Sequence, residues 1–131
     1  MIHLNVEKVD NLPDILLHVS SMQQVFMNLL SNAIDAVQQL ENKIIQIKTS
    51  YDNNHIQISF TDNGCGIRED IQHAIFNPFF TNKPVGEGTG LGLSISKSIV
   101  ENHYGQLVCK SSSKDGTTFT IVLPIHYGKN E

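Results

Sequence analysis

The sequence predicts an α+β protein, a two-layer sandwich in which a mixed, mostly antiparallel sheet carries helices on one face. Two long segments have helical periodicity, and two pairs of short alternating segments are each joined by turn residues. The chain has 131 residues, of which 40% are hydrophobic, enough for one domain with a buried core. We therefore expect residues 1–131 to form a single domain.

Two long helices and one short helix are expected. The first runs from about Ser20 to Leu40, where apolar residues recur every three or four positions. The second follows a glycine-rich loop and ends near Gly105, because glycine commonly terminates helices. The short helix is expected over residues 69–75.

Two hairpins supply most of the sheet. The residues in each pair of segments alternate between apolar and polar, and Asp52-Asn53-Asn54 and Lys114-Asp115-Gly116 between them are typical turn sequences. The strands are expected over residues 44–50 and 55–61, and over residues 107–110 and 118–123. Before them, we expect a short strand, a turn at Pro13 and a second extended piece that ends at residue 18.

Composition argues against several classes of protein. The net charge of −4 disfavours a nucleic-acid partner. No apolar run reaches the roughly 18 residues of a membrane span, and the first residues lack the pattern of a signal peptide. Cys65 and Cys109 do not have the spacing of a metal site, so free thiols in a reducing compartment are expected.

The first predicted helix has an unusual polar stripe, made of Gln24, Asn28, Asn32 and Asp35. An ordinary solvated face is the simplest interpretation, but such a face usually carries several charges, and here Asp35 is the only one between Ser20 and Leu40. Asparagine also disfavours helices. Neutral amide oxygens are good ligands for phosphate-bound Mg²⁺, so the stripe is compatible with a functional role, which is favoured only together with the other segments described below.

Two glycine-rich segments follow, a turn after a predicted strand and a loop before a predicted helix. Asp62 ends the second predicted strand of the first hairpin and precedes Asn63-Gly64-Cys65-Gly66, which alone is compatible with an ordinary turn; the second glycine favours a close approach of the backbone to a flat ligand. Cys65 is expected to pack. Gly88-Thr-Gly-Leu-Gly-Leu93 opens a helix, where free N–H groups bind phosphate. It lacks the Gly-Lys-Ser/Thr of a P-loop and the preceding strand of a dinucleotide-binding loop.

Four segments occur in a fixed order along the chain: Asn28–Ala33, Asp62–Gly66, Phe76–Lys83 and Gly86–Leu93. Together they resemble the N, G1, F and G2 boxes of the histidine-kinase ATP-binding domain, a branch of the GHKL superfamily, with a subtype like that of the nitrogen-regulation sensors. The resemblance implies the Bergerat-type fold, with ATP and Mg²⁺ as cofactors.

The resemblance also implies roles for single residues. Asn32 would coordinate Mg²⁺, Asp62 would accept a hydrogen bond from the adenine amino group, and residues 77–90 would form a lid over ATP. Lys83 is either a contact to the γ-phosphate or an ordinary solvated lysine. The ATP-binding residues implied are Asn28, Asn32, Asp62, Gly64, Gly66, Ile67, Phe76, Lys83, Gly86, Gly88, Thr89, Gly90, Leu91, Gly92 and Thr118.

The implied reaction is transfer of the γ-phosphoryl group to a histidine of a separate dimerisation domain, and indirectly to a response regulator. Related ATPases place a glutamate one turn before the Mg²⁺ asparagine, where this chain has Asn28, so fast hydrolysis is not expected. No histidine here has the context of an acceptor, so the dimerisation domain is absent from this chain.

By the same resemblance, the isolated domain is expected to be a cytoplasmic monomer that does not phosphorylate itself and does not touch the membrane. The full-length protein could still be anchored in the inner membrane. Two alternatives stay open. One is a stand-alone serine kinase of the anti-sigma type, and the other is a module that senses ATP without transferring phosphate.

Overall fold

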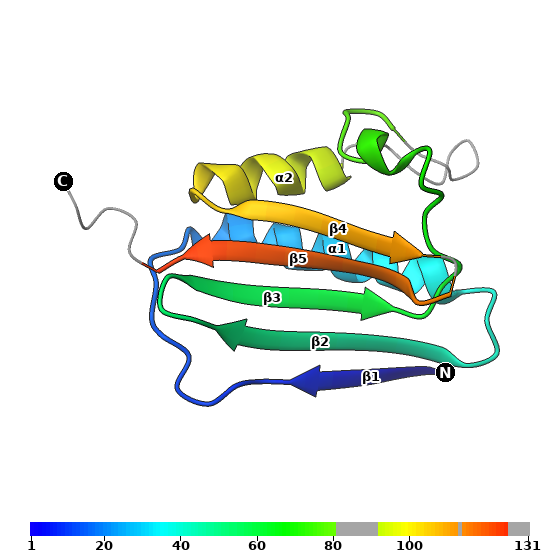
Figure 1. Ribbon diagram of the computed structural model, residues 1–131, viewed down its shortest axis with the longest axis horizontal. Helices are drawn as coiled ribbons and strands as arrows, with labels where there is room; N and C mark the ends of the chain where they lie inside the picture. Colours follow the sequence, from blue (N-terminus) through cyan, green and yellow to red (C-terminus); the bar gives the residue numbers. More distant parts are fainter. Residues whose placement is uncertain (81–91, 113, 126–131) are drawn as a thin grey trace.

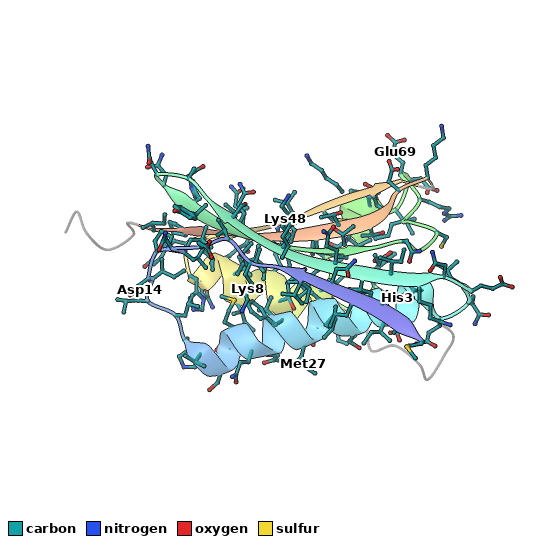
Figure 2. The ribbon with its side chains drawn as sticks, turned by 90° about the horizontal axis from the view of Figure 1, so that it is seen from below. His3, Lys8, Asp14, Met27, Lys48 and Glu69 are labelled. Atoms are coloured by element: carbon teal, nitrogen blue, oxygen red, sulfur yellow. The ribbon has the colours of Figure 1, made fainter. Side chains whose placement is uncertain are left out.

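A single five-stranded sheet carries two helices on one face (Figures 1 and 2). The structure is a computed structural model that describes residues 1–80, 92–112 and 114–125. Its elements in chain order are β1 (Ile2–Glu7), α1 (Val19–Val37), β2 (Lys43–Tyr51), β3 (His55–Asp62), a 3₁₀ turn (Gln72–Ala74), α2 (Gly92–Asn102), β4 (Gln106–Ser112) and β5 (Gly116–Pro124).

The strands lie in the order β1-β2-β3-β5-β4. β1 pairs with β2 in parallel, and the other three pairs are antiparallel. The sheet is therefore mixed and mostly antiparallel, as the sequence predicted, and both expected hairpins form. Since β3 pairs with β5, the two hairpins are joined into one sheet along their inner strands.

The core lies between the sheet and the two helices, with Val100 of α2 buried in it. Residues at helical spacing on α1, from Met22 to Val37, are buried against alternate residues of β3 and β5. Phe26 of α1 meets Phe60 of β3 edge to face, with ring centroids 5.6 Å apart. Met27 points away from the sheet and is exposed (Figure 2). The periodicity of the sequence therefore predicted the buried face of α1 correctly.

Two local predictions were wrong. The helix expected over residues 69–75 is reduced to the 3₁₀ turn Gln72–Ala74, because so short a segment gains too few helical hydrogen bonds to offset its nucleation cost. The turn expected at Pro13 lies at Asp10 and Asn11 instead, and residues 12–18 are neither helix nor strand, which is compatible with the extended piece that the sequence predicted. This segment connects β1 to the start of α1.

Among the described residues, no helix combines the length and the apolar character needed to cross a membrane.

Candidate functional site

Asp62 is a buried carboxylate at the end of β3, with only 5% of its surface exposed. It lies opposite Thr117 of β5 in the sheet. The backbone N–H of Gly64 donates to its Oδ1 at 2.8 Å, and the N–H of Thr117 also bonds to the carboxylate. The strand end and its turn therefore hold the acid in a fixed orientation.

Burial raises the pKa of Asp62 above its usual value, and the bonds from Gly64 and Thr117 offset only part of that shift. No ion pair to Asp62 is found within the described residues. A buried carboxylate that lacks a cation is costly for the free protein. Such a group can accept a hydrogen bond from a ligand, for example from an exocyclic amino group.

The turn after Asp62 is pressed against the second half of α1. A Cβ atom added to Gly64 would lie 2.6 Å from the carbonyl oxygen of Ala36, so a side chain does not fit there. Gly66 has φ of 81°, a conformation that L-residues with a side chain rarely adopt. Both glycines are therefore required by the local geometry, while Cys65 between them is exposed, contrary to the expectation that it packs.

The structure divides the polar stripe of α1. Gln24 and Asp35 are exposed, whereas Asn28 and Asn32 are half-buried on the side of the helix that leads to α2 and to the Asp62 turn. The Nδ2 of Asn28 donates to the carbonyl oxygen of Gly92 at 3.2 Å and to Oγ of Ser96 at 3.0 Å. Asn28 therefore joins α1 to the first turn of α2.

A hydrogen-bond network fastens the segment that follows Asp62 to the hairpin of β4 and β5. Ser111 Oγ accepts from the backbone N–H of Ile67 at 2.6 Å and lies 2.8 Å from Thr117 Oγ1. The Nε2 of Gln72 donates to the carbonyl oxygens of Ile67 and Ser111 at 2.8 and 3.3 Å. Ile67 itself packs against the core. The contribution of Ser111 and Gln72 was not foreseen from the sequence.

Phe76 is half-buried and meets Phe119 edge to face, with centroids 6.2 Å apart. Lys97 of α2 places Nζ 5.0 Å from the centre of the Phe76 ring, a cation–π arrangement. Phe79 is 73% exposed and has a positive φ of 67°, whereas Phe80 packs against the core. The segment Phe76-Asn-Pro-Phe-Phe80 is therefore only partly in the core.

Thr118 is the predicted site residue that the structure separates from the others. Its Oγ1 bonds to Thr61 Oγ1 at 2.9 Å, on the sheet face opposite the helices. Thr117 is buried beside Asp62 instead. Because strand residues alternate between faces, the buried positions Phe119 and Ile121 would have indicated Thr117 rather than Thr118.

The remaining predicted site residues lie outside the described residues. These are Lys83, Gly86, Gly88, Thr89, Gly90 and Leu91, with most of the predicted lid. Of the glycine-rich loop, the structure describes Gly92 and Leu93, the first two residues of α2.

Apart from Thr118, the predicted site residues that the structure describes gather toward one end of the molecule. The end of β3, the second half of α1 and the first turn of α2 meet there (Figure 1). The donor set consists of a buried carboxylate and two carboxamides, close to a helix N-terminus. Carboxamide oxygens suit Mg²⁺ that is already bound to phosphate, and a helix N-terminus suits phosphate itself. The residues present therefore fit ATP and Mg²⁺.

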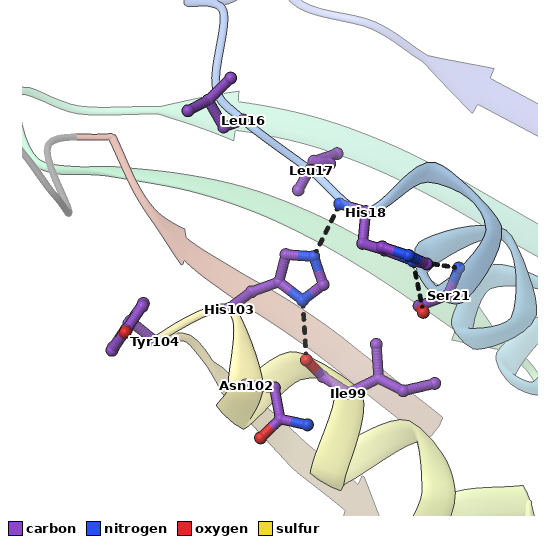
Figure 3. Close-up of a pocket in the computed structure, with 8 residues that line it drawn as sticks. All are labelled: Leu16, Leu17, His18, Ser21, Ile99, Asn102, His103 and Tyr104. Carbon is purple, nitrogen blue, oxygen red and sulfur yellow. Dashed lines mark hydrogen bonds between the residues drawn. The ribbon is translucent and has the colours of Figure 1, made fainter.

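A separate cavity of about 600 Å³ lies at the opposite end of α2, roughly 16 Å along the helix from Gly92 (Figure 3). His103, 8% exposed, lies in its wall. The ring accepts a hydrogen bond from the backbone N–H of His18 at its Nε2 (3.0 Å), and its Nδ1 lies 2.8 Å from the carbonyl of Ile99. Because a carbonyl only accepts, Nδ1 carries the proton and the ring is neutral. His103 therefore ties the end of α2 to the start of α1.

We expect His103→Phe to lower the free energy of unfolding by about 1–3 kcal/mol, because the N–H of His18 would lose its partner in a partly buried place. Urea unfolding measures this. His73→Phe, at an exposed position, is the control and should change little. ATP affinity of the folded variant should be unchanged, and equal stability of the two variants would contradict the assigned bonds.

Both thiols are free. Burial, and secondly the charge of Asp62, raises the pKa of Cys109 to about 11. Cys109 is therefore kept as an uncharged thiol at neutral pH, whereas Cys65 is open to solvent.

The family model described as "Histidine kinase-, DNA gyrase B-, and HSP90-like ATPase" matches residues 18–127. Sporulation kinase E of Bacillus subtilis (strain 168) is 35% identical over 130 residues, which are 99% of this chain and 17% of that protein. Sensor histidine kinase ZraS of Escherichia coli (strain K12) is 39% identical over 130 residues, 99% of this chain and 27% of that protein. The chain thus spans about a quarter or less of these relatives.

Among solved structures, the nucleotide-free catalytic domain of histidine kinase ThkA is similar, with a TM-score of 0.82 and 31% sequence identity. The match covers 95% of this chain and 80% of that one. The family match covers most of the chain, and the relatives and the solved structure named above are kinases. The chain therefore belongs to the family of histidine kinase-, DNA gyrase B- and HSP90-like ATPases, and its fold is that of a sensor histidine kinase catalytic domain.

Proposed function

We propose that this chain binds Mg²⁺–ATP at the end of β3 and donates the γ-phosphoryl group to a histidine of a dimerisation domain in the same full-length protein. The observation that carries this proposal is the meeting of three groups at one end of the molecule: the buried Asp62, the half-buried asparagines of α1 and the first turn of α2. The carboxylate suits the adenine amino group, the asparagine amides suit phosphate-bound Mg²⁺, and the first turn of a helix suits phosphate.

The roles follow from the chemistry of the groups. Asp62 would accept from the adenine amino group, and Gly64 and Gly66 would keep the backbone close to the ring. Asn32 would supply an oxygen to Mg²⁺. Phosphoryl transfer depends mainly on positioning and charge neutralisation. The bound Mg²⁺ would supply the neutralising charge, and the residues of this chain orient the nucleotide.

Transfer to a protein acceptor is favoured over hydrolysis by Asn28. A carboxamide is not a general base at neutral pH, and the two bonds of its Nδ2 to α2 give it a structural task. The isolated chain should therefore bind ATP with little turnover. In the cell, we place it as a cytoplasmic, monomeric domain that reaches a response regulator only through its dimerisation domain.

Addition of the protein's own dimerisation domain tests this function. We expect an acid-labile, base-stable phosphate on a histidine of that domain in the presence of Mg²⁺–ATP. Rapid steady-state turnover by the isolated chain would move it to the ATPase branch of the family. An acid-stable phosphoserine on a small partner would indicate a serine kinase of the anti-sigma type, and ATP binding without any transfer would indicate a sensing module.

Asn32→Ala should weaken ATP binding about ten- to a hundredfold in Mg²⁺, because it removes an oxygen ligand of the cation. In EDTA, the variant and the parent should bind nucleotide equally. Calorimetry under both conditions measures this. Asn102→Ala, exposed at the far end of α2, is the matched control. An equal loss in EDTA and in Mg²⁺ would exclude Asn32 as a metal ligand.

A further inference from the structure

The carboxamide of Asn28 has a determined orientation. The carbonyl oxygen of Gly92 lies 3.2 Å from one of its terminal atoms. A carbonyl oxygen can only accept a hydrogen bond, so that terminal atom is the nitrogen, Nδ2. Ser96 Oγ, which could either donate or accept, must then accept at 3.0 Å. Two acceptors on α2 use both hydrogens of Nδ2.

This orientation decides what Asn28 can offer to a ligand. Oδ1 and Nδ2 both lie 4.0 Å from the position of a Cβ atom added to Gly92, so Oδ1 is also next to the first turn of α2, the end of the helix that suits phosphate. With both hydrogens engaged, Oδ1 is the only atom of the group left to bind a partner. An oxygen held in this way suits a cation or its bound water, and would repel a bare phosphate.

Ser96 is well suited to maintain the orientation. It is completely buried on α2 (0% exposed), and a buried hydroxyl is seldom kept in a core without a bonding task. The Gly92 carbonyl is at the first turn of α2, where helix ends fray. The Ser96 bond, one turn further in, is the firmer of the two attachments. Gly92 itself leaves room, since an added Cβ would lie 3.8 Å from Cγ of Asn28.

We propose that Ser96 is a positioning residue for the nucleotide site, which holds Asn28 with Oδ1 toward phosphate-bound Mg²⁺ and thereby sets part of the metal-dependent affinity for ATP. The inference rests on the proposed function. It adds a second amide oxygen on the cation side of the site, supplied by Asn28 and oriented by a residue of another helix.

The first test uses the nucleotide-free protein and does not depend on ATP. In nitrogen-15 spectra, the side-chain NH₂ of Asn28, assigned by its loss in Asn28→Ala, should exchange slowly with water. Ser96→Ala should speed that exchange about three- to tenfold and move its shifts toward those of an exposed amide. Ser96→Thr, which keeps the hydroxyl, should restore both. Ser98→Ala, exposed on the same helix, is the control and should change neither.

The second test measures affinity by calorimetry. Ser96→Ala should weaken binding of ATP about three- to tenfold in Mg²⁺ and leave it unchanged in EDTA, and Ser96→Thr should recover most of the loss. An Asn28 amide that exchanges as fast as an exposed one would overturn the orientation. A slow amide with unchanged Mg²⁺-dependent affinity in Ser96→Ala would overturn the positioning role and leave the proposed function intact. A parent that binds no ATP would overturn both.

Discussion

Asp62→Asn should weaken ATP binding about ten- to a hundredfold and leave the free protein at least as stable at neutral pH. The loss of affinity follows from the removal of a charge-assisted hydrogen bond to adenine, worth about 1.5–3 kcal/mol. Preference for ATP over GTP should narrow as well, because an amide can donate as well as accept. Calorimetry gives the affinities, and urea unfolding gives the stability of the free protein.

The stability effect follows from the raised pKa of Asp62. A carboxyl group whose pKa is raised by folding stabilises the folded state below the unfolded pKa, and this contribution is lost as the pH rises through the folded pKa. At neutral pH the charged, buried carboxylate therefore destabilises the free protein, and the neutral amide does not carry this cost. The advantage of the variant should be largest near neutral pH and shrink as the pH falls toward 3.8, the usual value for aspartate.

Asp10→Asn is the matched control, because it removes the same charge from an exposed position. It should leave ATP affinity unchanged. A variant at position 62 that binds ATP as the parent does would remove Asp62 from the nucleotide site. If the variant were markedly less stable at pH 7, the hydrogen bonds from Gly64 and Thr117 to the carboxylate would outweigh the cost of burying its charge.

Gly116→Ala should destabilise the protein by about 2–4 kcal/mol and abolish tight ATP binding. Gly116 has φ of 78°, which costs a residue with a side chain about 1 kcal/mol or more. A Cβ atom there would also overlap the carbonyl oxygen of Asp62 and lie 3.1 Å from Cα of Asn63. The end of β3 would have to move, and the acid would move with it.

Gly92→Ala is the control for this prediction. Its added Cβ would make only an ordinary contact with Asn28, at 3.8 Å or more, so we expect stability to change by about 0.5 kcal/mol or less. Urea unfolding of the two variants gives the comparison. If Gly116→Ala and Gly92→Ala were equally stable, the close contact between Gly116 and the backbone at the end of β3 would be contradicted.

The sequence by itself determined the two long helices and two of the four strand pairings, those of the two hairpins. Apolar residues every three or four positions gave the first helix, since this spacing fixes which side of a helix can be buried. Alternation and turn residues gave both hairpins. The position of Asp62 at a strand end, followed by two glycines, was also evident, because turn chemistry is local to a few residues.

The predictions that depend on distant segments were less secure. The short helix at residues 69–75 failed, and in its place Gln72 bonds to β4, a partner about forty residues away. Thr118 was predicted at the site, but the pairing of β3 with β5 puts Thr117 beside Asp62. A shift of one residue moves a side chain to the other face of a sheet, so local pattern alone does not decide such a position.

Only the tertiary structure decided how the polar groups are oriented. The sequence marked Asn28 and Asn32 as unusual, but it contained no sign that Ser96 and Gly92 hold one amide by its nitrogen. The sequence also contained no sign that the ring of His103, at the end of α2, accepts a hydrogen bond from the backbone N–H of His18 at the start of α1. Periodicity records which face of an element is buried, whereas the partner of a polar atom depends on the packing of segments that are far apart in the chain.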